Sequence, residues 1–61
     1  MNIKLKDLLS IVSTSQPIQL ENEYYDETFY PTYSDMSNKY GDYYVTNIVL
    51  IKEILLITIR Q

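Results

Sequence analysis

The chain has 61 residues, no cysteine, no histidine and a formal net charge of −3. We expect one domain, residues 1–61, whose small core leaves little stability to spare. The missing residue types exclude disulfides and disfavour a structural zinc site, so oligomerisation is the expected route to extra stability. The acidic balance disfavours nucleic-acid binding through phosphate neutralisation.

The sequence predicts neither a signal peptide nor a membrane span. The opening MNIKLKDLL contains Asp7 and is not followed by a run of small residues typical of a cleavage site. The apolar run near the other end falls short of the roughly 20 residues that cross a bilayer. Lys52 and Glu53 also interrupt it. We therefore expect a soluble, intracellular protein.

Residues Ile3 to Val12 are expected to form a short helix. Its apolar stripe has the i, i+3, i+4, i+7 spacing of one helix face: Leu5, Leu8, Leu9 and Val12. Pro17 and the serines before it signal the end. A helix this short is marginal alone, so the stripe is expected to dock on a sheet.

Two short strands and a turn-rich segment are expected next. Pro17–Glu21 and Glu27–Tyr30 alternate apolar and polar residues, which indicates half-buried strands. Pro31 ends the second strand because it cannot donate a ladder hydrogen bond. We expect a single helical turn near Ser34–Asn38, with Met36 closing one end of the core.

The longest apolar run, YYVTNIVLIKEILLITI, predicts a C-terminal hairpin with strands at about Tyr44–Ile51 and Ile54–Ile59. Lys-Glu is not a favoured two-residue turn, so a wider loop stays open. A tight turn would place Ile51 opposite Ile54 and Val45 opposite Arg60. A helix through this run is the competing interpretation, but its many β-branched residues favour strands. The expected fold class is α+β: one N-terminal helix on a small, mostly antiparallel sheet of three or four strands, ending in the hairpin.

The hairpin has more apolar surface than one helix can cover. In the tight-turn register, one face carries four aliphatic side chains near the turn: Val49, Ile51, Ile54 and Leu56. A patch of this kind is rare on a small monomer. We therefore expect a homodimer or higher oligomer, in which a two-fold axis lets this patch cover its own copy.

The sequence gives little support for catalysis, and no cofactor or metal is expected. No histidine is present to act as a base, and the Asp26–Glu27 pair lies in a loop, where solvated carboxylates are the rule. The segment Asp35–Asp42 has its glycine in the wrong place for a calcium loop.

The middle of the chain, Glu21 to Tyr44, is acidic and rich in tyrosine. It holds six carboxylates, one lysine and all seven tyrosines of the chain. One interpretation is a solvated face whose rings pack at the sheet margin. The other is an interface for a basic protein, because tyrosine is enriched at interfaces and carboxylates steer a basic partner. The candidate partner-binding residues are Glu23, Tyr24, Tyr25, Asp26, Glu27, Tyr30 and Tyr33.

Three short motifs carry a resemblance to a known group: K-L-K-D-L-L at Lys4–Leu9, P-I-Q-L at Pro17–Leu20, and S-D-M followed by Tyr40 and Tyr43. Together with the final hairpin, they make the chain resemble small phage and prophage proteins of low-GC Gram-positive hosts. It departs from them at Glu23–Tyr33, where a glycine-containing hairpin turn would be usual. The resemblance implies an accessory inhibitor of host defence, such as an anti-CRISPR protein, in the cytoplasm of the infected bacterial host. No active-site residue is carried over.

Three hypotheses follow. The first is a non-enzymatic phage inhibitor that binds a host defence protein with a basic surface through the acidic, tyrosine-rich residues. The alternative is a structural or regulatory phage module that acts through self-association and has no host target. A small enzyme is the third and is disfavoured.

Overall fold

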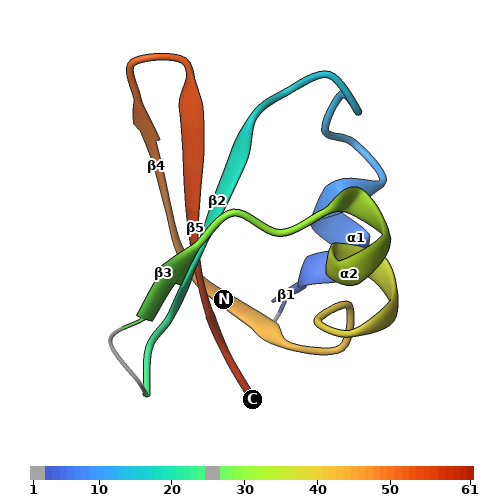
Figure 1. The fold of residues 1–61 in the computed structure, drawn as a ribbon. Coiled ribbons are helices and arrows are strands. Elements are labelled where there is room, and N and C mark those ends of the chain that lie inside the picture. Colours follow the sequence, from blue (N-terminus) through green and yellow to red (C-terminus); the bar gives the residue numbers. More distant parts are fainter. Residues whose placement is uncertain (1–2, 25–26) are drawn as a thin grey trace.

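The computed structural model describes residues 3–24 and 27–61, without the side chain of Glu27. The elements in this part of the chain are β1 (Ile3–Lys4), α1 (Leu5–Leu9), β2 (Ile18–Asn22), β3 (Glu27–Phe29), α2 (Tyr33–Asn38), β4 (Tyr44–Ile51) and β5 (Ile54–Arg60). The strands form one sheet in the order β1-β4-β5-β2-β3 (Figure 1). β2 and β5 are parallel, and the other neighbouring strands are antiparallel.

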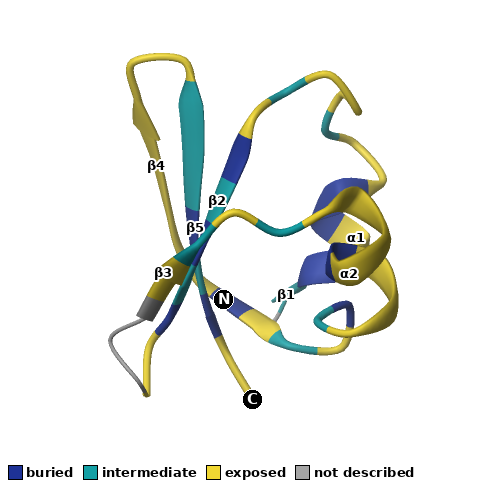
Figure 2. Ribbon diagram, in the orientation of Figure 1, coloured by how far each residue is buried: buried dark blue, intermediate teal, exposed yellow. Residues whose placement is uncertain are grey.

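Both helices lie on the same side of the sheet, so the molecule has two layers (Figure 1). We call the helix-covered side of the sheet the inner face and the opposite side the outer face. The core lies between the layers, where buried residues of both meet (Figure 2). Its buried apolar residues are Leu5, Leu8, Leu9, Ile18, Leu20, Met36, Val45, Ile57 and Ile59. The α+β class is confirmed.

The N-terminal helix is shorter than predicted. In place of a helix over Ile3–Val12, the chain forms β1 and then the five residues of α1. Lys4 is extended, with φ −86° and ψ 152°, and β1 pairs with the start of β4. The Leu5 N–H then donates to the Tyr43 carbonyl at 2.9 Å. The prediction was wrong here because Ile3 and Lys4 pair with the start of β4, which lies far along the chain. This pairing gives their backbone N–H and C=O groups hydrogen-bond partners, whereas so short a helix would be only marginally stable.

α1 ends at Leu9, before the Ser13-Thr14-Ser15 run and Pro17 that were expected to end it. The Ser10 hydroxyl donates to the Asp7 carbonyl at 2.6 Å, and the Ile11 N–H donates to the Leu8 carbonyl at 3.1 Å. These are i to i−3 contacts, which tighten the last turn and stop the helix. The apolar stripe nevertheless packs as predicted: its three leucines are buried, and Val12 lies half-buried against the core.

The number of strands and helices also differs from the prediction. The described sheet has five strands rather than three or four, and the parallel pairing of β2 with β5 makes it mixed. The helical turn expected near Ser34–Asn38 is a second helix, α2, which begins after Thr32. The Thr32 hydroxyl accepts a hydrogen bond from the Asp35 N–H at 3.1 Å, a side-chain N-cap. Met36 on α2 is buried, as expected.

The C-terminal hairpin has the tight two-residue turn. Ile51 pairs with Ile54 and Val49 with Leu56, as the tight register predicts. Lys52 supplies the required left-handed residue, with φ 58°.

The prediction for the base of the hairpin was wrong. Val45 pairs with Ile59 rather than with Arg60, because a register shift lies between Val45 and Asn47. The shift brings Val45 onto the inner face beside Ile59, and both side chains are fully buried. Burial of the Val45 side chain favours this irregularity over a regular ladder.

Candidate functional site

The first candidate surface begins at the turn after β2. The Glu23 N–H donates to the Ile59 carbonyl at 2.9 Å, and the Tyr24 N–H donates to the Asn22 side-chain oxygen at 3.0 Å. Asn22 is buried, so these two hydrogen bonds tie the start of the turn to the sheet. Glu23 and Tyr24 project into solvent, and the Tyr24 side chain is 65% exposed. The start of the turn therefore presents the Tyr24 ring and the Glu23 carboxylate from backbone that is fixed by hydrogen bonds.

Two more tyrosines of the predicted set lie at the other end of β3. Tyr30 follows β3 directly and is 69% exposed, and Tyr33 is the first residue of α2 and is 44% exposed. The Thr32 N-cap between them fixes where α2 begins. The three-residue strand β3 separates Tyr30 from the turn, so the structure places the exposed tyrosines at two ends of a strand. Tyr25 and Asp26 lie outside the described residues, as does the side chain of Glu27.

Other tyrosines of the acidic segment are part of the core. Tyr40 packs against Phe29 with ring centroids 5.3 Å apart, and against Tyr43 at 5.4 Å with the rings nearly perpendicular. Both tyrosines are half-buried and line the hydrophobic core. Their geometry is the edge-to-face packing that aromatic pairs favour. The two interpretations of the acidic segment, packed rings and an exposed interface, thus apply to different residues. Tyr40 and Tyr43 pack against the core, whereas Tyr24, Tyr30 and Tyr33 are exposed.

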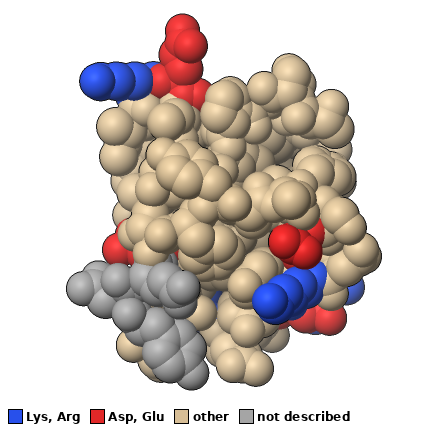
Figure 3. Space-filling view, viewed as in Figure 1, with Lys and Arg blue, Asp and Glu red and all other residues tan. Residues whose placement is uncertain are grey.

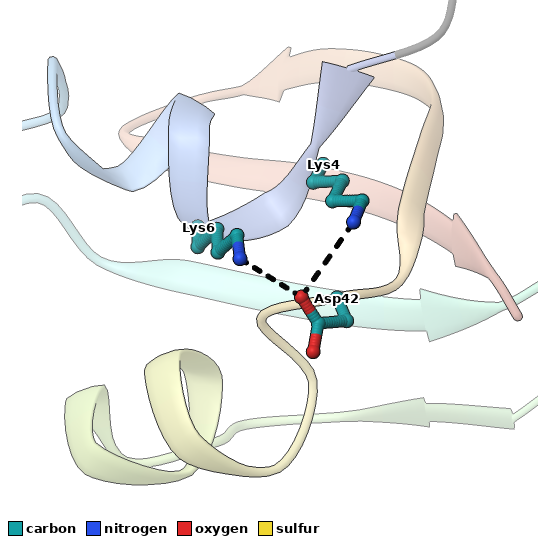
Figure 4. A network of polar contacts seen from close by, with 3 residues as sticks. All are labelled: Lys4, Lys6 and Asp42. Atoms are coloured by element: carbon teal, nitrogen blue, oxygen red, sulfur yellow. Dashed lines mark ion pairs between the residues drawn. The ribbon is translucent and has the colours of Figure 1, made fainter.

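One acidic residue of the segment is held in an ion pair. The Asp42 carboxylate lies 3.0 Å from the Lys6 ammonium and 3.8 Å from that of Lys4, joining the loop before β4 to α1 and β1 (Figure 4). The hydrogen bond and charge of Lys6, with the charge of Lys4, lower the pKa of Asp42. The same contact raises the pKa of Lys6. The negative charge of Asp42 is therefore balanced by two lysines. Glu23 and Asp35 are exposed carboxylates of the same segment.

The four predicted self-association residues do come together. Val49 with Leu56 and Ile51 with Ile54 are direct neighbours on the outer face of the hairpin. Val49 is 39% and Ile51 49% exposed, while Ile54 and Leu56 are half-buried. Toward β2 the outer face becomes polar, and the Thr58 hydroxyl donates to the Glu21 carboxylate at 3.4 Å. The apolar patch is thus confined to the end of the hairpin nearest its turn.

Sequence reasoning missed two exposed residues on the inner face. Ile48 is 38% and Leu50 65% exposed. Their partners on β5 are Ile57 and Leu55, which belong to the core or pack against it. The signal was present in the lengths of the elements, since a helix of a few turns spans less than an eight-residue strand.

Most of the charged side chains visible in Figure 3 gather at the hairpin turn and at the lower right, and the middle of that face carries none.

An open cavity of about 360 Å³ lies between the hairpin and the loop before β2, lined by Ser13, Ser15, Gln16, Pro17, Leu50, Lys52 and Glu53. Gln16, one of the lining residues, donates from its side-chain amide to the Glu53 carbonyl at 2.7 Å.

Within residues 3–24 and 27–61, no three potential ligand side chains gather closely enough to hold a metal ion. Over the same residues, no helix has the length and apolar character that a membrane crossing requires. Comparison with family models, with curated proteins and with solved structures gave no match to this chain.

Proposed function

We propose that this protein is a non-enzymatic phage accessory protein that inhibits a host defence protein by binding to its basic surface. The acidic tyrosine surface, defined as Glu23, Tyr24, Tyr25, Asp26, Glu27, Tyr30 and Tyr33, would carry the contact. The observation that supports this proposal most is the exposure of Tyr24 and Tyr30, at 65% and 69%. We place its action in the cytoplasm of the infected bacterial host, as the resemblance to phage proteins implies.

Exposed tyrosine rings on a folded surface are well suited to binding another protein. A tyrosine ring has only two side-chain torsions, so it offers a large contact area at a small entropic cost. The hydrogen bonds of the Glu23 and Tyr24 N–H groups hold these two residues at the start of the turn, which reduces the ordering cost of binding through Tyr24. Carboxylates beside the rings would attract a basic protein and raise the association rate.

The test is capture of a binding protein from host lysate, followed by association kinetics with that protein. Reversing Glu23, Asp26 and Glu27 to lysine is expected to slow association and flatten its salt dependence. Tyr24→Ala is expected to act on dissociation, by roughly 1–2 kcal/mol if the ring is a hot spot. Ile11→Ala is the matched control, because Ile11 is 80% exposed and lies outside this surface. Binding that none of the substitutions changes would contradict the proposal.

The exposed hairpin supports a second candidate, a structural or regulatory phage module that acts through self-association. Val49, Ile51, Ile54 and Leu56 would be the contact residues on the outer face. Fully burying one such side chain contributes roughly 1.5–3 kcal/mol, so finishing the burial of these partly exposed groups in two copies would stabilise a small domain appreciably.

Sedimentation equilibrium at tens of micromolar tests this second candidate. The wild-type chain is expected to be a dimer or higher oligomer. Leu56→Glu would give a weaker or less stable assembly, whereas Gln19→Glu, beside Leu56 on β2, would change neither property. A folded monomer at that concentration would contradict self-association and leave only the binding of a host protein.

A further inference from the structure

Strand β4 carries exposed aliphatic side chains on both faces of the sheet. Val49 and Ile51 are 39% and 49% exposed on the outer face, and Ile48 and Leu50 are 38% and 65% exposed on the inner face. Figure 2 shows this exposure along the part of β4 nearest the turn. Ile57, opposite Ile48 on β5, is fully buried, so the exposure belongs to β4 as the outer strand of the hairpin.

The edge of β4 is also open for most of its length. On the side away from β5, β1 pairs with β4 only at Tyr44 and Val45. None of the described residues pairs with that edge from Thr46 to Ile51. Exposed edges are usually protected by lysine, proline or a bulge. Here the segment TNIVLI has neither charge nor proline, and the register shift lies only at its base.

The exposed side chains on both faces of β4 and its open edge can be covered by one binding partner, an added strand. A surface laid flat on the outer face would leave Ile48 and Leu50 in water. An added strand in the plane of the sheet reaches both faces and supplies partners for the open backbone groups. We propose that β4 of a second copy pairs antiparallel with this edge, so that one sheet continues through a two-fold dimer. This inference rests on the self-association function and moves its contact from the outer face, where Ile54 and Leu56 lie, to the edge of β4.

A second copy fits the edge because the segment is complementary to itself. A two-fold axis perpendicular to the sheet, lying beside Val49 at the open edge, places Val49 opposite Val49 of the second copy and Ile48 opposite Leu50. Residues of one face then meet residues of the same face, as an antiparallel ladder requires. Lys52 and Glu53 lie beyond the paired segment. An in-register parallel pairing would instead bring each of these charges beside its own copy, which is unfavourable.

The position of the axis follows from β1. Moving it to Ile48 would bring Ile51 of the second copy opposite Val45, where β1 already occupies the edge. Moving it to Leu50 would shorten the paired segment. Centring on Val49 pairs residues 47–51 of each copy and avoids β1. The paired segment therefore coincides with the exposed part of the strand.

The test compares two substitutions to lysine by sedimentation equilibrium, with circular dichroism to confirm folding. Leu50→Lys, on the inner face of the edge strand, is expected to raise the dimer dissociation constant at least tenfold. Leu56→Lys, on the outer face of the inner strand β5, is expected to raise it less than threefold. Ile11→Lys is the control on an exposed aliphatic residue of the loop after α1 and is expected to have no effect.

Two further measurements report contact between copies through β4: a crosslink at Val49, which either mode of association allows, and hydrogen exchange, which distinguishes edge pairing. The chain has no cysteine, so Val49→Cys introduces a unique thiol that is expected to form a disulfide-linked dimer under mild oxidation. Ile11→Cys is expected to remain uncrosslinked under the same conditions. In the wild type, hydrogen exchange should slow at least tenfold as concentration rises through the dissociation constant, at those β4 amides between Thr46 and Ile51 that face the open edge, which are every second residue.

The outcomes separate the pairing mode from self-association itself. A wild-type chain that remains monomeric, with no crosslink through Val49→Cys, overturns both. A dimer that survives Leu50→Lys but dissociates with Leu56→Lys overturns edge pairing and leaves association through the outer face. If both substitutions dissociate the dimer, hydrogen exchange decides: β4 amides that stay unprotected at high concentration overturn edge pairing.

Discussion

The two ends of the β4–β5 hairpin have similar side chains and opposite surroundings. At the base, Val45, Ile57 and Ile59 are fully buried beneath the helices. Near the turn, Leu50 and Ile51 are 65% and 49% exposed. Residue type does not distinguish the two ends, since both are rich in β-branched and aliphatic residues. What differs is whether a second layer lies over them.

The reach of the helices explains this difference. α1 has five residues and α2 six, so each is roughly 8–9 Å long at 1.5 Å per residue. β4 has eight residues and extends over roughly 27 Å at 3.4 Å per residue. Two such short helices cover the base of the hairpin and leave its end uncovered. The base therefore supplies the stability of the fold, and the end is available for association.

Truncating one aliphatic residue at each end gives the largest expected contrast. Ile57→Ala is expected to lower the free energy of unfolding by roughly 2–5 kcal/mol, because it leaves a cavity in the core. Leu50→Ala, measured in dilute protein where the chain is monomeric, is expected to cost less than about 1 kcal/mol. Urea unfolding of both variants measures the difference. Equal losses would mean that the hairpin end is as well packed as the base.

A smaller effect is expected from the close approach of the loop before β4 to α2. A Cβ at Gly41 would clash with the Ser37 carbonyl oxygen and lie 3.2 Å from its carbon. These are backbone atoms, so Gly41→Ala forces a shift in α2 or in the loop and is expected to cost roughly 1–3 kcal/mol. Thermal unfolding measures it, with Thr14→Ala in an exposed loop as the control. A melting temperature unchanged by Gly41→Ala would show that the base tolerates movement.

The parts of the fold that were predicted correctly depend on local patterns. The leucine stripe of α1 and the burial of Met36 each follow from residues near one another in sequence, and the pairing of Ile51 with Ile54 is the tight-turn alternative that the sequence left open beside a wider loop. The outer-face patch was predicted for the same reason, because strand alternation and the turn fix which side chains share a face.

The parts that were wrong depend on contacts between distant segments. Ile3 and Lys4 form β1 because the start of β4 is there to pair with them, and no local pattern announces this. The parallel pairing of β2 with β5 similarly joins Ile18 to Leu55 across most of the chain. Strand propensity gives no direction of pairing, so this neighbour was not predictable from composition.

The tyrosines show the same limit at the candidate site. Tyr24 and Tyr40 lie in the same acidic segment and have the same chemistry. One is exposed at a turn, and the other packs between Phe29 and Tyr43. Aromatic enrichment identified the segment, but only the packing of the rings separates the residues available for binding from those that stabilise the core.

A substitution in the turn of the hairpin is expected to stabilise the protein, in contrast to the destabilising changes above. Lys52 has φ 58°, a conformation that glycine adopts at much lower cost. Lys52→Gly is expected to raise the free energy of unfolding by up to about 1 kcal/mol, partly offset by the greater freedom of glycine in the unfolded chain. Glu53→Gly, at the neighbouring position, is the matched control and is expected to destabilise. Urea unfolding of both variants is the measurement. Destabilisation by both would mean that the turn is not strained at Lys52.

The smallest expected effect lies at the base, in the ion pair of Asp42 with Lys6 and Lys4. The pKa of Asp42 is lowered in the folded state, so its stabilisation is present above the unfolded pKa and is lost as pH falls through the folded value, from about pH 4 downward. The effect is small because the pair is exposed and screened by salt. Asp42→Asn is expected to reduce the loss of stability between pH 7 and pH 3, whereas Glu23→Gln, an exposed carboxylate outside this pair, is expected to change it less. Urea midpoints at the two pH values measure this. An equal reduction by both substitutions would place the pH dependence in net charge rather than in this contact.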